Sequence, residues 1–225
     1  MKIYNPDITH NIIYSPREGH EPYLRYNHDV DIIKFKNRFF AAWNANEATT
    51  EGAPGQYNYM SYSDDFEHWT DPVKLFSSES DCINPVESDN QWQPGFANWQ
   101  DKTLFCAWCD FKAARTMIAT SEDGIHWKNR DVPPAPDSLR GQVVGFPTNH
   151  GLITSKNVIM FPCSLPYVGE SYFVSDTFYA AILYSCDGGI SWQWSNPIEG
   201  LPWSEVGVDI PIEGRDRTAI WEPVL

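Results

Sequence analysis

Two histidines of this chain have sequence neighbours that suit proton transfer. His28 lies in Asn27-His28-Asp29, and His150 lies in Asn149-His150-Gly151. An imidazole near its usual pKa can act as a general acid or a general base around neutral pH. Glu222 and Asp29 could instead act as a carboxylate pair in hydrolysis, and their separation would then decide between retention and inversion. These positions are far apart in the sequence, so repeated elements must bring them together.

Three short segments are variants of one pattern and supply such a repeat. They run from Ser63 to Trp69, from Ser121 to Trp127 and from Ser185 to Trp192. In each, Ser, Asp and usually Gly favour a tight turn whose carboxylate accepts bonds from its own backbone, while the Trp is expected to bury itself between strands. The copies recur about every 60 residues, a period typical of propellers and solenoids.

The third segment fits the Asp box, S-x-D-x-G-x-[ST]-W, at every position; the second is one residue shorter, and the first is also short and has Phe66 in place of Gly. The chain therefore resembles the sialidase superfamily of β-propellers. This resemblance implies an all-β fold of four-stranded antiparallel blades, six in the complete ring, with each box in the turn between the third and fourth strands. We expect one propeller domain over residues 1–225, with blades at about 28–75, 92–130 and 147–200 and a fourth beginning near 217.

The chain stops before this fourth unit gains a second strand. We therefore expect it to be a fragment of a longer five- or six-bladed protein, or to need a second chain to complete the ring.

A hairpin pattern precedes each box and sets the alignment of the repeats. Without gaps, Trp43 aligns with Trp108 and Cys163, and His28 aligns with Gln93. His150 lies two residues from the aligned position in the third unit, and Trp221-Glu222-Pro223 repeats Trp92-Gln93-Pro94. The first strands of propeller blades begin at the mouth of the central funnel, so we expect His28, Gln93, His150 and Glu222 to meet there.

Two long loops are expected at the same end, opposite the boxes. Residues 44–56 contain Glu51, and residues 164–176 contain Tyr172. Long loops on a rigid scaffold commonly carry function. The box residues Asp64, Asp65, Asp123 and Asp187 are expected to form turns and to take no part in catalysis.

The resemblance also suggests the chemistry of the mouth. Sialidases grip a carboxylate with three arginines, the first in R-[IL]-P, but here Arg25 is followed by Tyr26. The two histidines look instead like those of propeller enzymes that cleave uronic-acid glycans, such as ulvan lyases and rhamnose–glucuronate lyases. In such a β-elimination, one histidine would remove the proton next to the carboxylate, the other histidine or a tyrosine would supply the acid, and a cation must neutralise the carboxylate.

The candidates for catalysis are His28, His150 and Glu222. The candidates for substrate binding are Arg25, Asp29, Gln93, Arg115, Tyr172 and Arg217, with Arg215 as a further source of positive charge. The expected function is cleavage of an acidic glycan, by hydrolysis or β-elimination. The alternative is a non-catalytic propeller that binds carbohydrate or protein, with Trp92, Trp99, Tyr172 and Trp221 as stacking surfaces.

Composition limits the classes of molecule that this chain is expected to bind. With Lys+Arg 16 against Asp+Glu 30, the net charge is −14, which disfavours nucleic acid and anionic membranes and leaves a glycan as the expected partner. The sequence indicates no metal and no other cofactor, and the oligomeric state stays open. No signal peptide or membrane-spanning run is present, so we expect a soluble protein, cytoplasmic as written or secreted if the N-terminus is processed. Cys106 and Cys109 are expected to be buried thiols and not zinc ligands.

Overall fold

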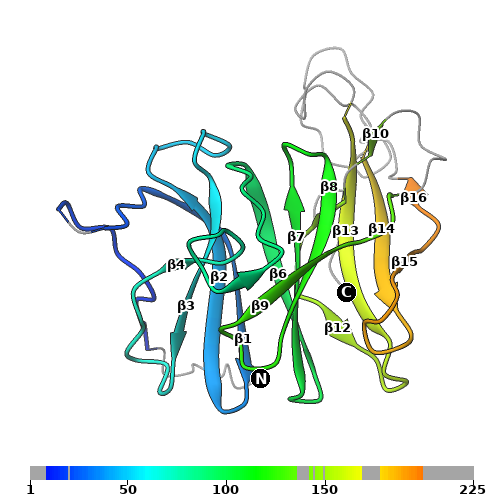
Figure 1. The fold of residues 1–225 in the computed structure, drawn as a ribbon, viewed down its shortest axis with the longest axis horizontal. Coiled ribbons are helices and arrows are strands. Elements are labelled where there is room, and N and C mark those ends of the chain that lie inside the picture. Colours follow the sequence, from blue (N-terminus) through cyan, green and yellow to red (C-terminus); the bar gives the residue numbers. More distant parts are fainter. Residues whose placement is uncertain are drawn as a thin grey trace, which may run out of the picture.

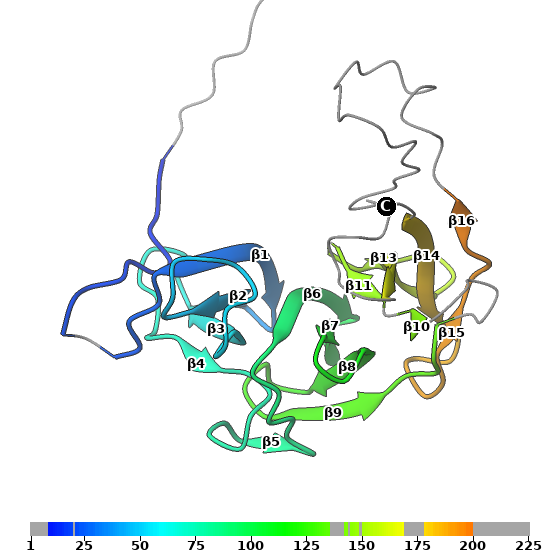
Figure 2. The ribbon, with the colours of Figure 1, turned by 90° about the horizontal axis from the view of Figure 1, so that it is seen from above.

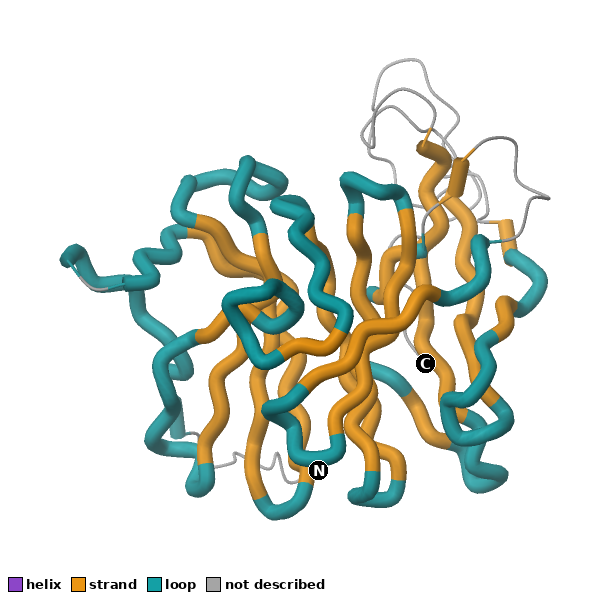
Figure 3. The backbone as a smooth tube through the Cα atoms, in the orientation of Figure 1, coloured by secondary structure: helices purple, strands orange, loops and turns teal. Residues whose placement is uncertain are grey.

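The computed structural model describes residues 9–19, 21–135, 142–143, 145–148, 150–168 and 178–199. Within these residues there is no helix, and so none that could cross a membrane. The described chain forms three separate sheets (Figures 1 and 3). The prediction of an all-β fold built from antiparallel sheets is confirmed.

The first sheet contains four strands in sequence order: β1 (Tyr26–Phe35), β2 (Arg38–Asn46), β3 (Tyr57–Ser63) and β4 (Val73–Lys74). The second has the order β5-β9-β8-β7-β6, formed by Cys82–Ile83, Trp127–Asp131, Arg115–Ser121, Thr103–Asp110 and Gln91–Trp99. Its short β5 pairs parallel with β9, and the other pairs in this sheet are antiparallel.

The third sheet is built around β13 (Ile159–Val168) and β14 (Phe178–Ser185). On one side, β13 pairs with three short strands, β10 (Gln142–Val143), β11 (Phe146–Pro147) and β12 (Leu152–Ile153). On the other, β14 pairs with β15 (Gln193–Trp194) and β16 (Ile198–Glu199). Seen from above, the three sheets form a fan whose inner side carries β1, β6 and β11 (Figure 2).

Apolar side chains on both faces of the middle sheet hold the fan together. Phe40 and Met60 of the first sheet share one buried cluster with Trp108 of the second. On the opposite face, Phe105 shares another cluster with Phe161 of the third sheet. Because successive side chains of a strand point to opposite faces, each apolar strand of the middle sheet packs against both neighbours.

The turns beginning at Ser63, Ser121 and Ser185 all lie at the end of the sheets where β1 and β6 finish, called here the box end. Ser63 pairs with Phe39, and Ser121 pairs with Leu104. In the first turn, Asp65 Oδ1 accepts from the backbone nitrogens of Glu67 and His68 at 2.8 Å. These bonds hold the pKa of Asp65 well below its usual range. Asp65, Asp123 and Asp187 therefore stabilise the turns, as expected, at the end opposite His28.

Two box glycines fit the turns against the neighbouring sheet. Gly124 has a φ of +82°, and a Cβ atom there would lie 2.2 Å from the ring of Phe40. Gly189 has a φ of +87°, and its Cβ would lie 2.3 Å from Phe105. Phe66 occupies the corresponding place in the first turn with a φ of 69° and packs on Phe39. Glycine is thus required where the box turn meets the preceding sheet.

The strand register corrects the sequence alignment of the inner strands. His28 pairs with Asn44, and the equivalent position in the second sheet is Trp92, which pairs with Cys109. Gln93 instead matches Asp29, since each follows these positions inside a β-bulge and has a positive φ, 48° and 54° respectively. The alignment of His28 with Gln93 was wrong because the hairpin loop of the second sheet contains one residue more than that of the first.

Candidate functional site

The bulge in β1 places His28 and Asp29 side by side at the end opposite the boxes. Two residues, Asp29 and Val30, lie opposite Trp43 in this bulge, so the regular alternation of side chains is interrupted. Asn44 is completely buried beneath them. With its amide nitrogen facing Asp29, Asn44 donates to Asp29 Oδ2 at 3.1 Å and to the carbonyl oxygen of His28 at 3.2 Å. The bulge is therefore supported from inside the sheet.

Glu51 reaches the same place from the loop between β2 and β3. The buried Gln56 anchors this loop, because its Oε1 accepts from the backbone nitrogen of Gly52 at 2.7 Å and its Nε2 donates to the carbonyl oxygen of Gln91 at 3.1 Å. Gly52 also lies close to Trp92: a Cβ atom added at Gly52 would lie 3.1 Å from the indole ring. The loop that carries Glu51 is thus fastened to the second sheet.

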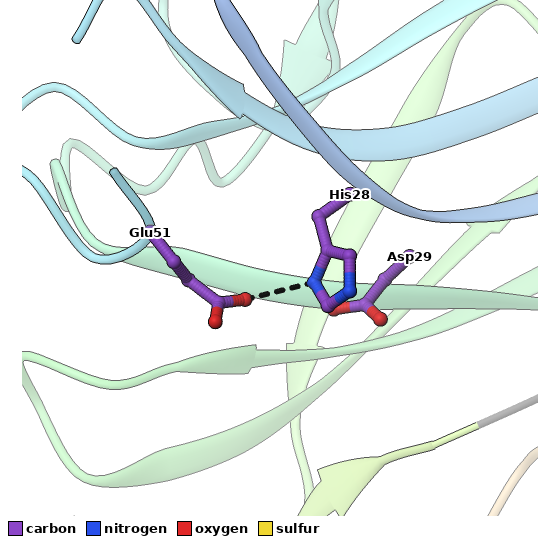
Figure 4. Close-up of side chains that lie close together, drawn as sticks. All are labelled: His28, Asp29 and Glu51. Carbon is purple, nitrogen blue, oxygen red and sulfur yellow. Dashed lines mark hydrogen bonds and ion pairs between the residues drawn. The ribbon is translucent and has the colours of Figure 1, made fainter. Parts of the chain in front are cut away.

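The two carboxylates meet at one imidazole nitrogen. His28 Nδ1 lies 2.9 Å from Glu51 Oε1 and 3.1 Å from Asp29 Oδ2. Figure 4 shows the imidazole between the two acidic side chains. The side chain of His28 is 48% exposed, against 20% for Asp29 and 30% for Glu51. A solvent-accessible imidazole is therefore oriented by two partly buried carboxylates.

Tyr26 is an aromatic side chain beside this group. Its ring centroid lies 5.9 Å from that of His28. Burial, the negative charges of Glu51 and Asp29, and a hydrogen bond with Glu51 raise the pKa of Tyr26 to about 12. The phenol is consequently protonated at neutral pH and can act as a hydrogen-bond donor.

A pocket of about 480 Å³ adjoins His28 and Asp29. Its walls include Tyr14 and Ile12 of the N-terminal segment, together with Trp43 of β2. The rings of Tyr14 and Trp43 are stacked with centroids 6.2 Å apart. An apolar, partly aromatic wall beside ionisable groups is the usual composition of a small-ligand site.

His150 has a different carboxylate partner. It lies between β11 and β12, and its Nδ1 is 2.9 Å from Asp31 Oδ1. The hydrogen bond with Asp31 raises the pKa of His150, although partial burial opposes the shift. The pocket beside His28 does not include His150. The two histidines thus belong to separate groups along the inner strands.

Two of the candidate arginines are engaged with other groups. Arg115 contacts Asp110 and Asp131 at 3.0 Å each, within the second sheet. Arg25 is exposed immediately before β1, and its Nε donates to the carbonyl oxygen of Glu47 at 2.6 Å. Arg115 therefore links the strands of one sheet. Arg25 contacts the loop that continues from Glu47 to Glu51.

Gln93 is buried in its bulge, and its Oε1 has no hydrogen-bond partner within the described residues. Tyr172, Arg217 and Glu222 lie outside the described residues, as does the segment expected to begin a fourth blade.

Glu51, Tyr26 and Asp31 were not among the candidate site residues. Glu51 had one signal in the sequence, its place in a long loop at the correct end. Asp31 and Tyr26 flank the Asn27-His28-Asp29 motif, but their contacts depend on neighbouring strands and on the bulge.

The comparisons with known proteins agree with the fold. No protein-family model and no curated protein matches the chain. Among solved structures, a protein of unknown function from Dyadobacter fermentans matches 83% of this chain and 57% of its own, with 16% identity and a TM-score of 0.63. A Hadza microbial sialidase matches 76% of this chain and 37% of its own, with 14% identity and a TM-score of 0.59.

The NanB sialidase of Streptococcus pneumoniae matches 85% of this chain and 46% of its own, with 11% identity and a TM-score of 0.59. The chain thus spans between about one third and somewhat more than half of these proteins. At such identities the similarity concerns architecture, and it shows that the chain has a sialidase-like all-β fold.

Proposed function

We propose that this chain is part of a six-bladed β-propeller enzyme that cleaves a glycosidic linkage in an acidic glycan, with His28, Asp29 and Glu51 as its proton-transfer group. The fan of sheets supports the propeller, with the three sheets as successive blades. A similar solved structure is a Trypanosoma rangeli sialidase in complex with sialic acid, at 13% identity and a TM-score of 0.54. This neighbour supports an acidic sugar as the class of substrate.

The observation that carries the proposal is the convergence of two carboxylates on His28 Nδ1, at 2.9 and 3.1 Å, beside a pocket. A carboxylate that accepts the Nδ1 proton fixes the tautomer and orientation of an imidazole and stabilises its protonated form. In that tautomer, Nε2 on the other side of the ring is an acceptor and can take a proton from water or from substrate.

This arrangement suits both reactions that the sequence suggests. In hydrolysis, the group would activate a water molecule and protonate the leaving oxygen. In β-elimination, His28 would remove the proton next to the uronate carboxylate, and the protonated phenol of Tyr26 is a nearby donor. Arg115 takes no part in this scheme because its guanidinium binds Asp110 and Asp131.

A non-catalytic glycan-binding propeller is the second candidate. The pocket wall of Tyr14 and Trp43 favours it, since sugars pack on aromatic surfaces without any need for proton transfer. In that case, the carboxylates around His28 would only position it as a hydrogen-bonding group. The two functions differ in whether a product forms.

The test is incubation with sialosides and with uronate-containing glycans, following reducing sugar and the ultraviolet absorbance of unsaturated uronates. We expect product with the complete protein that contains this chain, and a loss of about 100-fold or more in its His28→Ala and Glu51→Gln variants. His68→Ala and Glu122→Gln, exposed positions at the box end, are the matched controls and should retain activity. Glycan binding without product would support the binding protein, and equal activity in His28→Ala would exclude His28 as the proton-transfer group.

A further inference from the structure

We propose that His28, Asp29 and Glu51 bind a divalent transition-metal ion, with Mn²⁺ as the best match. One nitrogen or oxygen atom from each of the three side chains lies within 4.8 Å of the other two. Imidazole nitrogen combined with two carboxylates is a donor set that first-row transition metals accept readily. Mg²⁺ and Ca²⁺ prefer oxygen ligands alone, so the histidine favours a transition metal.

The spacing of the donors suits six-coordination. Neighbouring ligands of an octahedral ion with bonds of about 2.1 Å are about 3.0 Å apart, whereas those of a tetrahedral ion are about 3.4 Å apart. His28 Nδ1 lies 2.9 Å from Glu51 Oε1 and 3.1 Å from Asp29 Oδ2. Both separations match the octahedral value, which favours Mn²⁺ over tetrahedral Zn²⁺.

The local charge favours a cation as well. Two carboxylates supply negatively charged oxygen donors here, in a chain whose net charge is −14. The nearby Arg25 directs its Nε to the carbonyl oxygen of Glu47. A divalent ion would be attracted by both carboxylates.

The donors come from two separately supported segments, as in an organised metal site. Asp29 is held by the buried Asn44 within the β1 bulge, and Glu51 by a loop anchored through Gln56. Outer residues that orient the ligands in this way raise metal affinity. Protein groups therefore hold the donors together in spite of the repulsion between the two carboxylates.

A buried acceptor without a partner lies on the neighbouring strand β6, next to the residue that supports Asp29. The backbone nitrogen of Gln93 lies 3.4 Å from the side-chain amide of Asn44, so Gln93 adjoins the residue that supports Asp29. Gln93 is 9% exposed, and its Oε1 has no hydrogen-bond partner among the described residues. Buried polar atoms normally have a partner, and a water molecule bound to an ion is a suitable donor.

The ion would deepen the proposed function, and this part of the inference depends on that function. An acidic glycan needs a positive charge to neutralise its carboxylate, and Arg115 is paired within its own sheet. A metal ion on His28 Nδ1 would supply this charge, and Nε2, which then carries the ring proton, would act as a hydrogen-bond donor to substrate and not as the base. The metal site itself does not depend on catalysis and can be tested without a glycan.

The test is titration of the metal-free chain with Mn²⁺, followed by electron paramagnetic resonance and calorimetry. We expect one saturable ion per chain and a loss of affinity of about 10-fold or more in His28→Gln and Glu51→Gln. His68→Gln and Glu122→Gln at the box end should bind as the unchanged chain does. Circular dichroism establishes that each variant is folded, and His28→Gln, at an exposed side chain, is the variant least affected by a change in the bulge.

Two results would overturn the site: no saturable binding up to about 1 mM Mn²⁺, or equal binding by the unchanged chain and His28→Gln. Either would leave the three side chains as a hydrogen-bonded group only. Binding of Mn²⁺ without cleavage of any glycan would instead contradict the proposed function and leave the metal site intact. Cleavage unaffected by a chelator would show that the ion takes no part in catalysis.

Discussion

Asp31 and His150 lie 119 residues apart in the chain and are joined by a contact of 2.9 Å between Oδ1 and Nδ1. Asp31 Oδ2 also accepts from the backbone nitrogen of Phe96 at 2.6 Å. One carboxylate of β1 thus connects the inner edges of all three sheets. Close by, the backbone nitrogen of Gly151 donates to the carbonyl oxygen of Phe96 at 2.7 Å.

Removal of this carboxylate should destabilise the fan. Asp31→Ala leaves the backbone nitrogen of Phe96 without its acceptor, and an unsatisfied buried donor costs about 1–3 kcal/mol. Urea denaturation should show this decrease in the free energy of unfolding. The exposed Asp71→Ala should change it by less than about 0.5 kcal/mol. Equal stabilities of the two variants would show that Asp31 does not connect the sheets.

His150 should make stability depend on pH. Its pKa is raised in the folded protein, so the contact with Asp31 contributes fully below the unfolded pKa of about 6.5 and is lost as the pH rises through the raised value. Since the side chain is 43% exposed, the effect is at most about 1 kcal/mol. The difference in melting temperature between the unchanged chain and His150→Gln should therefore shrink between about pH 6 and pH 9. The exposed His10→Gln is the control, and a difference that grows with pH would contradict the assignment.

Gly124→Ala should be far more harmful than alanine at another glycine with positive φ. At Gly124 the added Cβ meets the ring of Phe40 at 2.2 Å, whereas at Gly55, with a φ of +86°, it meets nothing within 4 Å. Both variants carry the backbone strain of about 1–2 kcal/mol, but only Gly124→Ala also forces the two sheets apart. Thermal denaturation should show that the free energy of unfolding of Gly124→Ala is lower than that of Gly55→Ala by about 1–3 kcal/mol. Similar losses would mean that only the φ value matters.

The loop that carries Glu51 should loosen when Gln56 is truncated. Gln56→Ala removes the acceptor of Gly52 and the donor to the carbonyl oxygen of Gln91, at a cost of about 1–3 kcal/mol. Hydrogen exchange should accelerate at residues 50–56 more than in β7. Gln100→Ala, at an exposed hairpin, is the matched control. Unchanged exchange in this loop would show that Gln56 is not its anchor.

The cysteines should differ sharply in reactivity toward a thiol reagent. Cys186 is exposed and Cys82 is partly buried, whereas Cys106, Cys109 and Cys163 are completely buried. Burial raises the pKa of all three inner thiols. We expect Cys186 to react first in the folded chain and the inner thiols to react only after unfolding. Rapid reaction of all five without denaturant would contradict the described packing.

Much of the architecture could be predicted because short segments of the sequence specify it. The box turns are specified by residues three or four positions apart, as in Asp65 and His68, and their backbone bonds form within the turn itself. Hairpin patterns likewise indicate strands through local side-chain alternation. The expectation that Cys106 and Cys109 are buried thiols is confirmed for the same reason, since both lie inside an apolar strand.

The candidate site depended more on register than on residue type. His28 and Asp29 could be selected from the sequence. The match of His28 with Gln93 failed because, with the second strands aligned, one extra residue in the hairpin of the second sheet shifts every position of the preceding inner strand by one. Glu51 lay in a loop whose path depends on Gln56 and on Trp92 of the second sheet. No local pattern specifies such contacts.

By itself, the sequence determined that this chain forms repeated antiparallel sheets with box turns at one end and His28 and Asp29 at the other, because periodic turns and alternating side chains are local properties. The tertiary structure alone decided the partners of these groups: Glu51 with His28, and Asp31 with His150. Bulges, loop paths and sheet packing set those distances, and they follow from contacts between residues that are remote in the chain.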